Sequence, residues 1–151
     1  MKTVLYVDDD PNDLLLFRSA CHLTQVSFRL QVAAGGVQAI NYLAGEAAFA
    51  DRAQHAVPDF ILLDLKMPGW DGFDVLRWVR SNCATTHTPL ALYTGSLVQA
   101  DIIRGFAEGA NYFITKPSDI RVMSDIARAI DACLATNFVQ TQSLSRFSIR
   151  P

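Results

Sequence analysis

The chain has 151 residues, of which 50% are apolar, so it fits one domain with a buried core. Its net charge of −2 gives no basic surface for nucleic acid, and 19% charged residues are too few for a disordered acidic module. No apolar run approaches the ~20 residues that span a bilayer, and no signal peptide precedes the first expected strand. We therefore expect a cytoplasmic protein without nucleic-acid or membrane partners.

The first expected strand, Thr3 to Val7, runs directly into three carboxylates. Asp10 is placed to cap the next helix, with Pro11 at its first position. Asp8 and Asp9 have no such explanation, because two further like charges at a strand end repel each other unless a cation lies between them. These two residues are candidate metal ligands.

The second strand is expected at residues 28–32, and the helix that follows opens at Gly35-Gly36 and includes Leu43. The stretch from Gly45 to Pro58 is longer than the ~4–6 residues of a typical connection. We expect it to form a helix extension and a surface loop, and its role stays open.

The third strand, Phe60 to Leu63, is a continuous apolar run of the kind that is buried on both faces. It ends in Asp64, and a Pro-Gly loop and a helix capped by Asp71 follow. Asp64 therefore lies at the carboxyl end of a central strand, where ligands bind in open parallel sheets.

The fourth and fifth strands, residues 89–93 and 111–115, end in Thr94 and Lys116. Ser96 and Gln99 resemble a capping box for the helix between them. A last helix is expected at residues 119–135, and the Ser/Thr/Gln-containing tail at 137–151 shows no period. We expect this tail to be mobile, or ordered only by another chain. Five uninterrupted β-α units predict an α/β fold, a parallel sheet with helices on both faces.

The polar residues after the strands meet at one edge of such a sheet. The carboxylates of Asp8, Asp9 and Asp64 supply the hard oxygen ligands that suit Mg²⁺. Thr94 and Lys116, facing this cluster, supply the hydroxyl and the positive charge that stabilise an anion. The anion that best suits a site with Mg²⁺, Lys and Thr is a phosphoryl group. A carboxylate held there is a candidate acceptor.

The chain resembles the receiver domain of two-component response regulators over residues 1–136. The motifs that carry the resemblance are Val7-Asp8-Asp9-Asp10-Pro11, Leu63-Asp64-Leu65-Lys66-Met67-Pro68-Gly69-Trp70-Asp71-Gly72, Tyr93-Thr94-Gly95 and Lys116-Pro117. The resemblance implies a flavodoxin-like (βα)5 fold with strand order 2-1-3-4-5. It also implies a phosphoacceptor that signals by conformational switching and catalyses only its own phosphorylation and dephosphorylation.

The same resemblance implies a role for each site residue. Asp64 would be the phosphoacceptor, and Asp9, Asp64 and the Lys66 backbone carbonyl would bind Mg²⁺ directly, with Asp8 acting through water. Thr94 and Lys116 would bind the phosphoryl oxygens. Phe113 would be the aromatic switch, which moves from an exposed to a buried position, although the buried position can be populated before phosphorylation. A cis Lys116-Pro117 bond would aim the lysine at Asp64.

The implied phosphodonor is a sensor histidine kinase or a histidine phosphotransfer protein. The segment with Phe49 and Arg52 is similar to that of stand-alone receivers that partner phytochrome-type kinases. We expect no output domain after the tail; the downstream protein target and a homodimer stay open.

Three alternatives are weighed against this interpretation. A haloacid-dehalogenase-like phosphatase needs a second Asp two residues after the first, where this chain has Lys66. A flavodoxin-like carrier needs a hydroxyl-rich loop where this chain has Asp8-Asp9-Asp10. A receiver-shaped module that binds partners without phosphorylation would not need the complete acceptor set.

Overall fold

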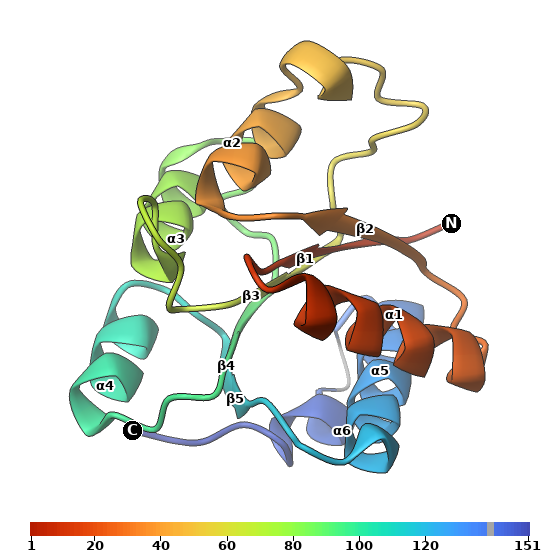
Figure 1. The fold of residues 1–151 in the computed structure, drawn as a ribbon, viewed down its shortest axis with the longest axis vertical. Helices are drawn as coiled ribbons and strands as arrows, with labels where there is room; N and C mark the ends of the chain where they lie inside the picture. Colours follow the sequence, from red (N-terminus) through yellow and green to blue (C-terminus); the bar gives the residue numbers. More distant parts are fainter. Residues whose placement is uncertain (139–140) are drawn as a thin grey trace.

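The computed structural model describes residues 1–138 and 141–151. At its centre lies a five-stranded sheet in the order β2-β1-β3-β4-β5, with every neighbouring pair of strands parallel (Figure 1). The strands are β1 (Thr3–Val7), β2 (Arg29–Ala33), β3 (Phe60–Leu63), β4 (Leu90–Thr94) and β5 (Tyr112–Thr115). The predicted fold class and strand order are confirmed.

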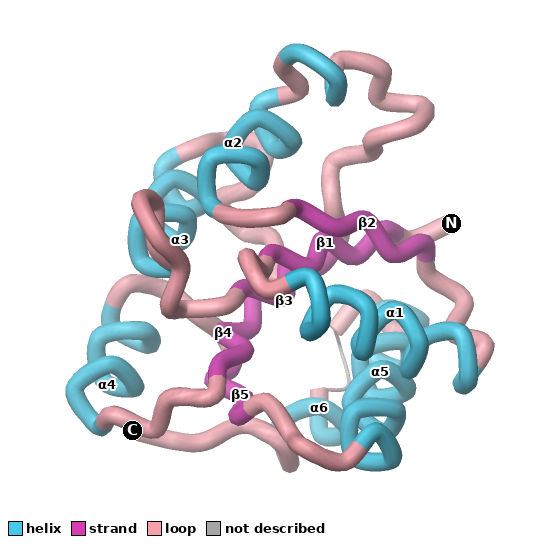
Figure 2. Tube along the Cα trace, viewed as in Figure 1, coloured by secondary structure: helices cyan, strands magenta, loops and turns pink. Residues whose placement is uncertain are grey.

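Helices cover both faces of the sheet (Figures 1 and 2). One face carries α1 (Pro11–Thr24), α5 (Ile120–Ala135) and α6 (Gln142–Ser145), and the other carries α2 (Gly36–Ala44), α3 (Gly72–Ser81) and α4 (Gln99–Ala107). Alternate strand residues face opposite sides, so Tyr6 packs in the first cluster and Leu5 in the second. Among the described residues, no helix has the length and apolar character to cross a membrane.

The helix starts follow the predicted caps in two of three cases. The Asp10 carboxylate accepts a hydrogen bond of 2.9 Å from the Asn12 N–H at the start of α1, and Asp71 and Asp74 form a reciprocal capping box at α3. The capping box predicted from Ser96 is wrong. Helix α4 instead follows Val98, which has no side chain able to accept an N–H bond.

The 46–58 segment packs against the end of α2. Helix α2 ends at Ala44 and Gly45 takes a left-handed conformation, so the expected extension is reduced to one 3-10 turn, η1 (Ala47–Phe49). The Arg52 guanidinium donates hydrogen bonds of 2.7 Å to the carbonyls of Tyr42 and Leu43. These carbonyls belong to the last turn of α2, where the helix supplies no N–H four residues further on, and the Tyr42 carbonyl also accepts the Gly45 N–H at 3.1 Å.

The tail expectation is wrong for the residues that the structure describes. Leu144 of α6 is fully buried in the cluster with α5, and residue 148 forms an antiparallel bridge to Ile114 of β5. The final residues then run along β5 towards α4 (Figure 1). The reason is apolar burial: Phe147 and Ile149 each pack against a core cluster of the same chain. Residues 139 and 140 of the expected tail lie outside the described residues.

Candidate functional site

The polar residues predicted at the strand ends lie at one edge of the sheet. Backbone bonds extend the ladders past the strands: Asp64 N–H donates to the Val7 carbonyl at 2.9 Å, and Lys116 N–H donates to the Thr94 carbonyl at 2.9 Å. The end of β3 is thereby fixed beside β1, and the end of β5 beside β4. These two registers bring the side chains that follow the strands to the same edge of the sheet.

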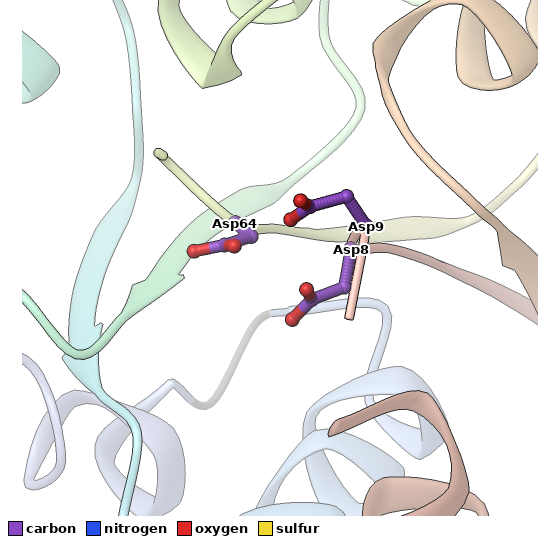
Figure 3. Close-up of side chains that lie close together, drawn as sticks. All are labelled: Asp8, Asp9 and Asp64. Atoms are coloured by element: carbon purple, nitrogen blue, oxygen red, sulfur yellow. The ribbon is translucent and has the colours of Figure 1, made fainter. Parts of the chain in front are cut away.

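Three carboxylates converge at this edge, as predicted (Figure 3). One oxygen each from Asp8, Asp9 and Asp64 lies within 4.8 Å of the others. Asp8 is fully buried and Asp64 is nearly so, whereas Asp9 is exposed to solvent. An all-oxygen donor set that is open on one side fits a small hard cation that keeps part of its water shell, such as Mg²⁺.

The Asp8 carboxylate is held by three donors. The Tyr6 hydroxyl donates to Oδ2 at 2.7 Å, the Asp10 N–H donates to Oδ1 at 2.9 Å, and the Lys116 ammonium lies 2.6 Å from Oδ2. Burial, and then the bond to Asp8, raise the pKa of the Tyr6 phenol, so its hydroxyl stays a donor at neutral pH.

Lys116 contacts three carboxylates at once. Its Nζ lies 2.6 Å from Asp8, 2.8 Å from Asp13 and 3.4 Å from Asp64. Burial alone would lower its pKa, but the bonds to Asp13 and Asp8 outweigh burial and raise the pKa above its usual value. The ammonium therefore stays charged at the acidic cluster.

The expected cis bond before Pro117 is wrong, because the Lys116-Pro117 peptide is trans. Lysine is long enough to reach Asp64 from this backbone, as the Nζ contacts show. The trans form is also the one that X-Pro bonds favour by about 0.5–1 kcal/mol.

The Asp64 carboxylate is buried beside a second negative charge. Its Oδ1 accepts the Leu65 N–H at 2.8 Å, and its Oδ2 faces Lys116. Burial and the negative charge of Asp8 raise the pKa of Asp64 to about 6, and Lys116 only partly opposes them. A cation among these carboxylates would offset both effects, which is a further sign that the site fits one.

Thr94 and Phe113 lie on the opposite face of the sheet from Tyr6. Thr94 is buried, and its Oγ1 accepts the Ser96 N–H at 3.3 Å. Phe113 is fully buried beside Leu92, so the exposed starting position expected for a switch is absent from this conformation. Gly105 of α4 makes this room, because a Cβ there would lie 2.6 Å from a Leu92 methyl group and 3.5 Å from the Phe113 ring.

A family model for the response regulator receiver domain matches residues 4–128. The chain belongs to the response regulator receiver family. This receiver is 38% identical over 105 residues to the response regulator PleD of Caulobacter vibrioides. The aligned region covers 70% of this chain and 20% of PleD. The chain spans about a fifth of the length of PleD and about half of the length of two other curated relatives that it matches.

Two solved structures extend the match over most of the receiver. The phosphorylated cyanobacterial phytochrome response regulator RcpA is 28% identical with a TM-score of 0.79, covering 89% of this chain and 95% of RcpA. RPA3017, a response regulator in red light signaling of R. palustris, is 28% identical with a TM-score of 0.78, covering 93% of this chain and 96% of RPA3017. The predicted resemblance to phytochrome-partner response regulators is therefore confirmed.

Lys66 takes a different place in this receiver from the other charged candidates. Its ammonium forms an ion pair of 3.0 Å with Asp101 of α4. The side chain thus joins the loop after β3 to the neighbouring helix. The role predicted for its backbone carbonyl in metal binding stays a prediction.

Two residues that contact the receiver's charged cluster were not predicted. Asp13 lies in the first turn of α1, where the helix dipole favours a negative charge, and its carboxylate also binds Lys116 at 2.8 Å. Tyr6 was assigned only to a buried strand. The available signal was its hydroxyl, which needs a partner when buried and lies on the same strand face as Asp8, two residues on.

Proposed function

We propose that this receiver accepts a phosphoryl group on Asp64 from the phosphohistidine of a sensor histidine kinase or a histidine phosphotransfer protein. The observation that supports it best is the convergence of three carboxylates with the Lys116 ammonium at one sheet edge. Such a site attracts a cation and an anion together, which is what phosphoryl transfer to a carboxylate requires.

In the proposed transfer, an Asp64 carboxylate oxygen attacks the phosphorus atom. The new oxygen-phosphorus bond forms as the phosphorus-nitrogen bond to the donor imidazole breaks, and the imidazole keeps the electron pair and is protonated. Leu65 orients the acceptor by its N–H bond to Oδ1. Lys116, 3.4 Å from Oδ2, is close enough to turn from Asp8 and Asp13 to the phosphoryl oxygens.

Asp8, Asp9, Asp64 and the Lys66 carbonyl would hold Mg²⁺. The ion would neutralise charge that builds up between the acceptor carboxylate and the phosphoryl oxygens. The oxygen spacing of 4.8 Å or less among the three carboxylates supports this assignment.

Signalling would pass from Asp64 to Thr94 and then to Phe113. A phosphoryl group adds about 1.5–2 negative charges and three acceptor oxygens, which favour a bond from the Thr94 hydroxyl. Thr94 and Phe113 share one face of adjacent strands, so a movement of Thr94 changes the space around the ring. Since Phe113 is already buried, phosphorylation would stabilise this buried position instead of creating it.

We propose a phytochrome-type kinase as the donor, acting in the cytoplasm. RcpA and RPA3017 are described as response regulators of phytochrome and red-light signalling. The packed 46–58 segment with Arg52, which the sequence alone associated with such receivers, supports the same partner class. Competing kinases in a phosphotransfer panel test this choice.

The function is tested by incubating the chain with acetyl phosphate or phosphoramidate and MgCl₂ and measuring the intact mass. We expect the mass to increase by that of one phosphoryl group. The increase should not occur when EDTA is present during the incubation, nor in Asp64→Asn. Asp125→Asn, an exposed ion-pair residue of α5, is the matched control and should be labelled. Repeated hydrolysis of a phosphoester would instead mean a phosphatase, and no labelling by any donor would mean a binding module.

A further inference from the structure

The Tyr6 hydroxyl is a buried polar group that the proposed phosphoryl transfer does not use. The side chain is fully buried in β1, and its hydroxyl donates to Asp8 Oδ2 at 2.7 Å. Because Asp8 is also fully buried, water does not replace this donor when it is removed. The bond is therefore a direct link between the apolar core and the acidic cluster.

Tyr6 shares Asp8 Oδ2 with Lys116, whose ammonium lies 2.6 Å away. The two donors differ in whether they stay bonded to Asp8 when a cation binds. Lys116 also contacts Asp13 and Asp64, and a cation bound among the carboxylates repels its positive charge. Tyr6 is neutral and is not repelled, so it remains on Asp8 when Lys116 moves.

The Tyr6 ring is fixed by its neighbours. Its centroid lies 5.2 Å from that of Phe17 and 5.7 Å from that of Tyr93, with both pairs in edge-to-face geometry. Such packing restricts the ring to one orientation and so aims the hydroxyl at Asp8. A supporting residue of this kind keeps a ligand within the narrow range of geometry that metal binding needs.

We propose that Tyr6 is a positioning residue that holds the Asp8 carboxylate in place for Mg²⁺. This inference rests on the proposed function for its metal, and it adds a residue to the site that the acidic motif does not contain. Tyr6 does not touch the cation or the phosphoryl group; it acts through Asp8 Oδ2, and Asp10 N–H fixes the other oxygen.

The same cluster supplies a matched control. The Tyr93 hydroxyl is buried and, within the described residues, has no hydrogen-bond partner. Tyr6→Phe and Tyr93→Phe therefore each remove one buried hydroxyl from the same group of rings. Only the first removes a bond to the acidic cluster.

The experiment measures the dissociation constant of Mn²⁺ by the electron paramagnetic resonance of the free ion, with Mg²⁺ as competitor. Tyr6→Phe should weaken the binding of both ions by about fivefold to tenfold, and Tyr93→Phe by less than about twofold. At saturating Mg²⁺, labelling of Tyr6→Phe should return to nearly the wild-type rate, because the acceptor is intact. Thermal unfolding in EDTA checks that both variants fold.

A double-mutant cycle with Asp8→Asn separates positioning from a general loss of structure. In the Asp8→Asn background, Tyr6→Phe should cause no further weakening of Mn²⁺ binding, because its path to the ion has gone. Equal dissociation constants for Tyr6→Phe and Tyr93→Phe would overturn the inference, and so would additive effects in the cycle. Wild-type protein that binds Mn²⁺ but takes no label from any donor would refute the proposed function alone.

Discussion

The two faces of the sheet are built in different ways. Under α1 and α5 lie the interlocked rings of Tyr6, Phe17 and Tyr93, and α5 buries eight of its sixteen residues. On the other face, α4 buries two of its nine residues and begins without a side-chain cap, and Ile103 is 52% exposed. The difference indicates that the proposed phosphoacceptor site is anchored to the first face, whereas α4 on the second face is held by less apolar burial.

The largest effect is expected from Asp9→Ala, which removes the exposed carboxylate of the cluster. The two remaining carboxylates should be too few to draw Mg²⁺ from its water shell. Labelling at subsaturating Mg²⁺ should fall well beyond the effect of about fivefold to tenfold that is expected for Tyr6→Phe. The assay is labelling by a small phosphodonor, with Asp125→Ala as control. Undiminished labelling would show that the metal assignment is wrong.

Leu144→Ala tests whether α6 belongs to the anchored face. Because Leu144 is fully buried against that face, its truncation should lower the free energy of unfolding by about 2–5 kcal/mol. Denaturant titration measures this, and the exposed Gln142→Ala is the control in the same helix. A change near zero for Leu144→Ala would restore the expectation of a tail that the fold does not need.

Asp64→Asn should stabilise the metal-free protein at pH 7.5 by about 1–3 kcal/mol. The pKa of Asp64, about 6 when folded, lies above its usual value, so the folded state binds this proton more tightly than the unfolded state. Wild-type stability therefore falls as the pH rises from ~4 through ~6, and the asparagine variant escapes this loss. Thermal melts in EDTA should show the gain at pH 7.5 and its disappearance near pH 4. A gain that is equal at both pH values would contradict this origin.

The smallest effect on labelling is expected from Thr94→Ala, which should accept phosphate on Asp64 yet fail to transmit it. The alanine variant lacks the hydroxyl that would bind the phosphoryl oxygens. Labelling should be normal. NMR should show the loss of phosphorylation-dependent shifts around Phe113. Thr115→Ala, the residue paired with Thr94 on β5, is the control and should keep the shifts. Shifts that survive in Thr94→Ala would mean that signalling follows another path.

The fold and the outline of the site were predictable because local and long-range signals agree. Buried apolar strands that end abruptly in Asp8, Asp64 and Lys116 fix both the topology and the residues at its edge. Asp10 and Asp71 also start their helices as predicted. Roles within the site are a separate matter. The structure places the residues, and the roles assigned to Asp64, Thr94, Lys116, the metal ligands and Phe113 all stay predictions.

What escaped prediction depends on contacts between residues distant in sequence. The pairing of Asp13 with Lys116 joins residues 103 positions apart, and no local pattern in the sequence signals it. The buried position of Phe113 was allowed for, but the role of the small residue at Gly105 in leaving room for it was not predicted. The prediction for the tail was wrong for a related reason. Its apolar residues are too few to form a period in the sequence, yet each packs against the core: Leu144, Phe147 and Ile149.

The outer edge of β5 is covered by the C-terminal residues of the same chain. On β5, Ile149 N–H donates to the Phe113 carbonyl at 2.7 Å, and the Ser148 hydroxyl accepts the Phe113 N–H at 3.0 Å. On β2, the Gln31 side chain donates to the Gln54 carbonyl at 3.1 Å, which ties the 46–58 segment to this outer strand. Exposed edge strands are sites where proteins join into aggregates. The C-terminal residues therefore occupy backbone groups of β5 at which a strand of another chain would otherwise pair.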